Sequence, residues 1–122
     1  MRYWKPIFIE ESKIPIYLSK IAPIEISAIT LGFIVIARSK LDAQTKRHEI
    51  IHFQQYLETF FIGFLILYMY DFIKHYINLG DGRLAYRSIR AEIEAYNNDS
   101  DAFYLLKRKR YDWILNNNRI LK

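Results

Sequence analysis

Two histidines and a glutamate, spaced as His48-Glu49-x-x-His52, are the residues of this chain whose types and spacing could do chemistry. On a helix, residues four apart lie one turn apart on the same face, so both imidazoles can reach one metal ion. Zn²⁺ accepts nitrogen and oxygen ligands and, in a catalytic site, leaves a position open for water. Glu49 follows the first ligand and can take a proton from that water as general base. The motif therefore predicts a zinc site that promotes hydrolysis.

The motif lies in a stretch that favours a helix. Residues 43–58 contain no glycine or proline, and Asp42 is suited to cap the helix N-terminus. We expect a helix over residues 43–60. Its core face should consist of the apolar residues Ile50, Phe53, Tyr56, Leu57 and Phe60, with Ile51 beside it. The alternative is a polar helix face that carries two of the chain's three histidines by chance.

A zinc site of this kind needs a third protein ligand. The candidates are His75 and the carboxylates of Glu58, Asp71, Asp81, Glu92, Glu94 and Asp99. Glu58 and Asp71 follow the motif on the same or the next helical segment and would point away from the metal. Residues 90–96 predict a separate helix that can pack across the motif helix. Glu92 and Glu94 lie about 160° apart on such a helix, so only one of them can be the ligand.

The whole chain, residues 1–122, predicts one domain with an α+β fold. Residues 1–38 should be the extended part, a small N-terminal β-sheet or hairpin. Prolines 6, 15 and 23 punctuate it and predict edge strands at residues 7–9 and 14–18. Residues 24–38 are the strongest strand candidate, with Gly32 marking a bulge or a close backbone approach.

Residues 43–115 should be the helical part, which carries the metal site on about four helices. After Gly63 the apolar pattern predicts helix at residues 64–76, either continuous with the motif helix through a kink or separate from it. Residues 78–82 predict a loop, followed by helices over residues 83–97 and 102–115. The polar tail, residues 116–122, should be frayed.

Composition limits the kind of site and the location. The chain has no cysteine, which excludes disulfides and thiolate zinc sites. No secretory signal is evident at the N-terminus, and the longest apolar runs are shorter than the roughly 20 residues that span a bilayer. We therefore expect a cytoplasmic protein with no ordinary transmembrane helix. Its net charge of +5 favours contact with acidic surfaces.

The basic run 107–110, flanked by aromatic residues, favours peripheral contact with an anionic membrane over contact with nucleic acid, which we do not expect. The aromatic block at residues 60–76 points the same way. The alternative is a solvated basic face with Leu105, Leu106, Trp113 and Ile114 turned inward.

Four further side chains are candidates for roles at the site. Tyr96 and Tyr86 can donate a hydrogen bond to a developing oxyanion, and we select Tyr96 as the second catalytic residue. Gln55, three residues after His52, is placed to bond a ligand or substrate. Arg47 can pair with Glu94 or Asp99. Each of the four has the simpler reading of a residue that only packs or is solvated.

The two motifs resemble those of the gluzincins, above all the membrane-linked group that includes the HtpX-type and Ste24-type peptidases. Those proteins carry H-E-x-x-H on one helix and E-x-x-A-D on a later one, and the first glutamate of the second motif binds zinc. Glu92-Ile93-Glu94-Ala95 matches E-x-x-A, and Tyr96 replaces the aspartate. The resemblance implies Glu92 as the third ligand, with Glu94 as the fallback.

Over residues 26–113 the chain also resembles small proteins of Bacteroidetes-type bacteria that carry H-E-x-x-H-x-x-Q-Q and E-x-E-A-Y. That resemblance implies no particular substrate.

The leading hypothesis is a zinc metallopeptidase in which His48, His52 and Glu92 hold zinc and Glu49 activates water. An exposed strand beside the motif helix would let an extended peptide or protein substrate add to the sheet edge, by analogy with zincins. Because the chain has little material to wall a cleft, a homo-oligomer or larger complex would complete it. The alternative hypothesis is a non-catalytic module that binds a membrane or a partner protein and whose zinc site is structural.

Overall fold

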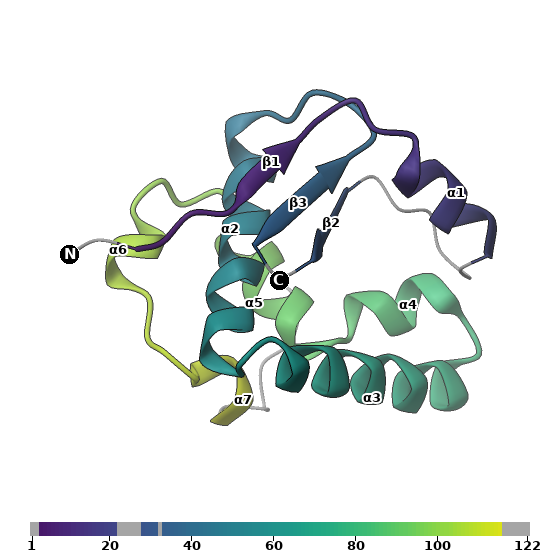
Figure 1. The fold of residues 1–122 in the computed structure, drawn as a ribbon. Helices are drawn as coiled ribbons and strands as arrows, with labels where there is room; N and C mark the ends of the chain where they lie inside the picture. The colour runs from purple at the N-terminus through teal and green to yellow at the C-terminus, as the bar shows by residue number, and fades with distance from the viewer. Residues whose placement is uncertain (1–2, 22–27, 32, 116–122) are drawn as a thin grey trace.

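The structure is a computed structural model that describes residues 3–21, 28–31 and 33–115. Three short strands form one sheet in the order β1-β3-β2: β1 (Ile7–Ile9), β2 (Ala28–Leu31) and β3 (Ile34–Ala37). β1 runs parallel to the central β3, with Ile7 opposite Ile34. β2 runs antiparallel to β3, with Ala28 opposite Ala37. Helices make up most of the rest, which confirms the α+β fold class (Figure 1).

The single strand predicted over residues 24–38 is wrong. The chain reverses between Leu31 and Ile34, so the stretch forms two paired strands in place of one. Two residues between antiparallel strands are the commonest hairpin connection. Residues 24–27 and Gly32 lie outside the described part of the chain.

The extended segment predicted at residues 14–18 is also wrong, because α1 (Ile14–Ile21) is a helix. Pro15 lies in its first turn, where the missing N–H group would have no partner within the helix. The Ser12 hydroxyl accepts the backbone N–H of Ile14 at 3.2 Å, which satisfies one donor of that turn. Pro15 therefore marks the start of a helix, whereas we had interpreted it as a sign of an edge strand.

The motif helix α2 (Ala43–Glu58) begins where the sequence predicted, because Asp42 accepts the Thr45 N–H at 2.8 Å. Ile50, Ile51, Phe53 and Tyr56 are buried along it, as expected. Phe60 is 86% exposed and does not belong to the core face. The helix ends at Glu58, and Phe60 and Phe61 take positive φ values of 54° and 64°, which redirect the chain.

α3 (Ile62–Leu79) follows at once and is bent from α2 by 113°, so these are two helices and not one kinked helix. No single helix in the described ranges is long and apolar enough to cross a membrane. Only α2 and α3 taken together, as a bent pair, meet the requirement of length and composition. In Figure 1, α3 lies along the lower edge of the molecule and the sheet along the upper part.

The two later helices predicted from the sequence are each interrupted. α4 (Gly82–Arg87) and α5 (Arg90–Asn98) are separated by Ser88 and by Ile89, which has an extended backbone. α6 (Tyr104–Lys107) and α7 (Asp112–Leu115) are separated by a segment that begins with the extended Arg108. Arg108 lies at the start of the second break, and its side chain is buried.

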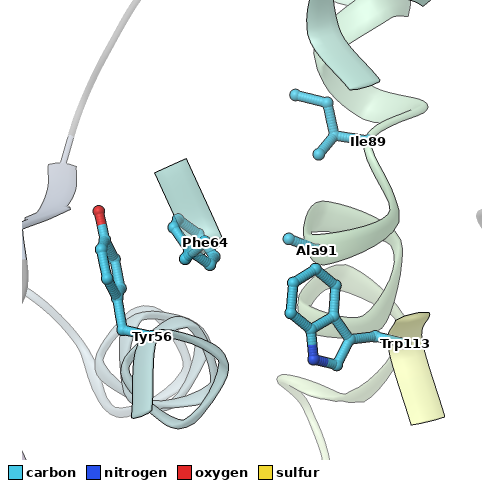
Figure 2. Packing of buried hydrophobic residues seen from close by; sticks show 5 residues of the cluster. All are labelled: Tyr56, Phe64, Ile89, Ala91 and Trp113. Carbon is cyan, nitrogen blue, oxygen red and sulfur yellow. The ribbon is translucent and has the colours of Figure 1, made fainter. Parts of the chain in front are cut away.

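Two apolar clusters hold these helices together. Tyr56, Phe64, Ile89, Ala91 and Trp113 form the larger cluster, shown in Figure 2. The Tyr56 and Phe64 rings in it are stacked with centroids 4.0 Å apart. The smaller cluster consists of Ile50, Ile51, Ala95 and Leu105. Both clusters include residues of α2 and α5, so these two helices pack against each other through the core.

A buried ion-pair network joins the C-terminal segment to the same helices. Arg108 donates to Glu58 (at 2.9 Å from Nη2) and to Glu94 (at 2.6 Å from Nε), and the side chains of all three are at most 5% exposed. Trp113 Nε1 donates to Glu58 at 2.9 Å. Arg108 thus belongs to the core, whereas Lys107, Lys109 and Arg110 of the same basic run are exposed.

Replacing Arg108 by leucine should lower the free energy of unfolding by about 3–5 kcal/mol, because it leaves two buried carboxylates without their cation. Lys109→Ala, one residue further along the same run, should change it by no more than about 0.5 kcal/mol. Urea denaturation followed by circular dichroism measures both. Equal stability of the two variants would contradict a buried role for Arg108.

Candidate metal centre

The two motif histidines and Glu92 converge on one point between α2 and α5. His48 Nε2 and His52 Nε2 each lie 3.0 Å from Glu92 Oε1. The three ligand atoms are all within 4.8 Å of one another, and the residues are 3 to 6% exposed. This buried group could hold a metal ion, and it is the only such group found among the residues that the structure describes.

Helix geometry and small side chains produce this convergence. His48 and His52 are one turn apart on α2, and their ring centroids lie 4.8 Å apart. On α5, Glu92 lies between Ala91 and Ala95, which are fully buried. Because these alanines add little bulk, α5 can pack closely against α2, and the Glu92 carboxylate reaches both imidazoles.

The donor set itself requires a positive charge at this point. Two imidazole nitrogens and a carboxylate oxygen present electron pairs to one another, and they repel unless a proton or a metal ion lies between them. Two nitrogens and one oxygen also match the ligands that transition-metal sites commonly use. The residues present therefore fit a divalent cation.

The other ring nitrogen of each histidine has a partner that orients it. Asp99 Oδ2 lies 3.0 Å from His48 Nδ1, and Gln55 Oε1 lies 2.8 Å from His52 Nδ1. Both oxygens accept a hydrogen bond, so each Nδ1 carries the proton and donates. When the imidazoles are neutral, that tautomer leaves the Nε2 electron pair directed at the metal position, as in metal sites whose histidines donate to a second group.

Gln55 is itself held in one orientation. Its Nε2 donates to the Ala91 carbonyl at 3.0 Å and to Glu94 Oε1 at 2.8 Å. The amide oxygen must therefore be the atom that faces His52. The sequence placed Gln55 near the metal face, and the structure brings it to the second histidine as an orienting group.

Asp99 orients the first histidine, a role that the sequence analysis did not assign to it. It comes seven residues after Glu92, two helical turns later, and contacts the first histidine. We considered Asp99 only as a metal ligand or as a partner of Arg47. Arg47 does contact it, but through the Asp99 backbone carbonyl. The i, i+7 spacing from Glu92 was the signal that could have assigned its role.

Glu49 is 6% exposed and lies beside the metal group. The Thr30 hydroxyl of β2 donates to its Oε2 at 2.7 Å, and the Tyr56 hydroxyl donates to the Thr30 carbonyl at 2.6 Å. The Glu49 charge also contributes to raising the pKa of both motif histidines, so it acts on the same point. The structure thus brings Glu49 to the site, where its role as general base stays a prediction.

Tyr68 of α3 is a site residue that the sequence analysis missed. Its hydroxyl donates to Glu92 Oε2 at 2.5 Å, which leaves Oε1 facing the histidines. Nothing in the sequence distinguishes it from the other nine tyrosines, because its place depends on how α3 folds back beneath α2. Glu92 is thereby oriented from a third helix.

The Tyr96 ring packs against His48 with centroids 4.4 Å apart. Its hydroxyl is paired with the Tyr86 hydroxyl at 3.0 Å, and the Arg87 guanidinium lies over its ring at 4.3 Å. Both tyrosines that we selected as oxyanion donors thus lie together beside the first histidine. The catalytic role of Tyr96 stays a prediction.

The pKa values of the site residues reflect the negative charge of the carboxylates around the two histidines. Burial works against a charged His48, but hydrogen bonds to Asp99 and Glu92 outweigh it and raise its pKa to about 10. Burial likewise opposes a charged His52, and the Glu92 charge nonetheless raises its pKa. For Glu92, burial is outweighed by the His52 charge and by hydrogen bonds from both imidazoles, which lower the pKa. The site therefore favours positive charge.

The remaining ligand candidates are occupied elsewhere. Glu94, our fallback ligand, is bound by Arg108 and Gln55, and Glu58 is bound by Arg108 and Trp113. Asp71 pairs with Arg90 at 2.9 Å, and Asp81 caps α4. None of these carboxylates, nor His75, belongs to the metal group found in the described ranges. The choice of Glu92 over Glu94 agrees with this geometry.

Comparison of the chain with protein-family models, curated proteins and solved structures finds no match. The gluzincin resemblance therefore rests on the two motifs alone, and the assignment to that family stays a prediction.

Removing any of the three converging groups should abolish metal binding. Purified protein reconstituted with Zn²⁺ should hold about one ion per chain, and His52→Ala or Glu92→Gln should hold almost none. His75→Ala removes the third histidine of the chain and is the matched control, which should bind as the wild type does. Elemental analysis after gel filtration measures the content. Loss of the ion in His75→Ala, or its retention in the other two, would refute the ligand set.

Asp99→Asn should weaken metal binding about tenfold without changing the number of ions bound, because the amide is a poorer acceptor for His48 Nδ1. Asp101→Asn, two residues further on and partly exposed, is the control. Competition with a chromophoric chelator gives both affinities. If the two variants bind equally well, Asp99 does not orient His48.

Proposed function

We propose that this protein is a zinc-dependent hydrolase, with peptides or proteins as its substrates. One observation carries the proposal: two imidazoles of an H-E-x-x-H helix and a carboxylate of a second helix meet at 3.0 Å contacts, with the motif glutamate buried beside them. Zinc is the ion that this donor set suits best, since it accepts two histidines and a glutamate in tetrahedral sites with an open position. His48, His52 and Glu92 would hold it.

A bound zinc ion would supply Lewis-acid chemistry, which polarises a carbonyl and brings the pKa of water toward neutrality. The protein groups supply orientation and proton transfer. Asp99 and Gln55 fix the tautomers of the two histidines, and Tyr68 holds the far oxygen of Glu92. These contacts prepare the site before substrate arrives.

Glu49 is the general base in this proposal. The Thr30 hydroxyl anchors its Oε2, so the carboxylate is held in one orientation and its Oε1 is the oxygen assigned to accept the proton. The same carboxyl group can then pass the proton to the leaving amine. Thr30 belongs to β2, which ties the base to the sheet.

Tyr96 is assigned to the developing oxyanion, with Tyr86 behind it. Burial raises the pKa of Tyr86 far above its usual value and also raises that of Tyr96. Both hydroxyls therefore stay protonated at neutral pH and can donate a hydrogen bond. Their mutual hydrogen bond orients them as a pair.

A non-catalytic protein with a structural metal is the second candidate, and burial is the observation that favours it. Each of the three ligand residues, and Glu49, is at most 6% exposed. Structural zinc sites are closed, whereas catalytic ones give water and substrate access to the metal. The two candidates differ in the role of Glu49. The hydrolase needs it for catalysis, whereas a protein with a structural metal does not.

The Glu49→Gln variant distinguishes the hydrolase from the protein with a structural metal. In the hydrolase, this variant should keep its zinc and its fold, since the amide oxygen still accepts from Thr30, while the hydrolysis rate falls by about 10²–10⁴-fold. Cleavage of a peptide library, read by mass spectrometry, measures the rate, and elemental analysis measures the zinc. If zinc-loaded wild type cleaves nothing and a chelator unfolds it, the structural candidate replaces the hydrolase.

A further inference from the structure

α3 is apolar on two opposite faces, and only one of them faces the protein. Its inner face packs Phe64, Leu67, Tyr68 and Phe72 into the larger core cluster. The opposite face, which we call the outer face of α3, consists of Ile62, Leu65, Ile66, Met69, Ile73 and Ile77. These six side chains are 47 to 76% exposed. A helix that is apolar all round is typical of an element covered on both sides.

The outer face is large for a patch in contact with water. At these exposures its six side chains present roughly 700 Å² of apolar area, above the 300–600 Å² of the largest patch on a typical monomer. Patches of that size mark surfaces that bind a partner or a membrane.

The width of the outer face favours a lipid surface over a second copy of the helix. Its residues span about 120° of the helix circumference, whereas the seam between two paired helices is a narrower stripe. Tyr70, which is 59% exposed, lies at its border, and Tyr76, which is 40% exposed, lies within it. Tyrosine suits the boundary between apolar and aqueous phases, because its ring is apolar and its hydroxyl is polar.

The charged side chains on α3 indicate which kind of lipid surface its outer face suits. Over residues 60–80 the exposed ionisable side chain is Lys74, because Asp71 is 4% exposed and paired with Arg90. Just beyond the helix, the exposed Asp81 and Arg83 carry opposite charges, so Lys74 is the cation that the helix itself presents. No carboxylate is exposed on this helix to repel an anionic headgroup, and the chain carries a net charge of +5. Basic side chains bordering an apolar face are attracted to anionic lipid.

We propose that the outer face of α3 binds the surface of an anionic membrane, with the helix lying parallel to the bilayer. α3 lies along the edge of the molecule away from β1 and the sheet (Figure 1), and the six side chains of its outer face are exposed. This places the membrane contact on α3 and not on the basic run 107–110, whose Arg108 is buried in the core. The contact requires neither bound metal nor hydrolysis.

Co-sedimentation of the full chain with vesicles of phosphatidylcholine and phosphatidylglycerol tests the proposal. Ile66→Glu should lower the partition coefficient at least about tenfold, because it removes an exposed apolar side chain that would enter the lipid and adds a negative charge. Ile7→Glu is the matched control, since Ile7 and Ile66 are both 64% exposed, and it should bind like the wild type. Lys74→Gln should lower binding to the mixed vesicles about fivefold and leave binding to phosphatidylcholine alone unchanged.

Three results would overturn the proposal: wild type that stays in the supernatant, equal binding by Ile66→Glu and Ile7→Glu, or a wild-type dimer that Ile66→Glu dissociates without any vesicle binding. The last result would assign the face to a second copy of the chain, and analytical ultracentrifugation detects it. Because Ile66 is exposed, its substitution should leave the thermal midpoint unchanged, which circular dichroism checks before the vesicles are used.

Discussion

The contact of one buried carboxylate oxygen with two imidazole nitrogens is the constraint on which the rest of the structure depends. Glu92 Oε1 lies 3.0 Å from both Nε2 atoms, in a place where the three residues are nearly inaccessible to water. A buried charge is strongly destabilising unless it is paired and hydrogen-bonded. The surrounding chain provides those partners: Asp99 and Gln55 to the histidines, and Tyr68 to the carboxylate. Three helices must therefore meet at this point.

α5 uses its two glutamates on opposite sides for two different purposes. Glu92 faces the histidines, while Glu94 faces Arg108 and Tyr104. Gln55 connects the two sides, because its amide contacts His52 with one end and Glu94 with the other. Arg108 is thus indirectly linked to the second histidine through Glu94 and Gln55. This explains why the last part of the described chain folds against the motif helix and does not continue as a helix.

The motif helix and its two histidines could be predicted because local rules determine them, whereas the selection of Glu92 over Glu94 came from the resemblance. A cap at Asp42, an i, i+4 histidine pair and the angular separation of Glu92 from Glu94 are all properties of a single helix. Tertiary contacts decided what the sequence could not predict. Arg108 interrupts a segment of good helical pattern because a buried ion pair outweighs helix propensity, and Tyr68 reaches Glu92 only because α3 turns by 113° after α2. Pro15 fits two local structures, an edge strand and the first turn of a helix, and pattern alone selected the wrong one.

α3 joins the metal centre to the surface of the molecule. Its inner face carries Tyr68, which holds Glu92, and its outer face carries the exposed isoleucines. In the described part of the chain, the core packs only the inner face of this 18-residue helix, which is apolar on both sides. The inner face is fixed by the core and by the site, and these leave the outer face in water. Any molecule that covers the outer face therefore binds within one helix diameter, about 10 Å, of the residues that orient the metal ligands.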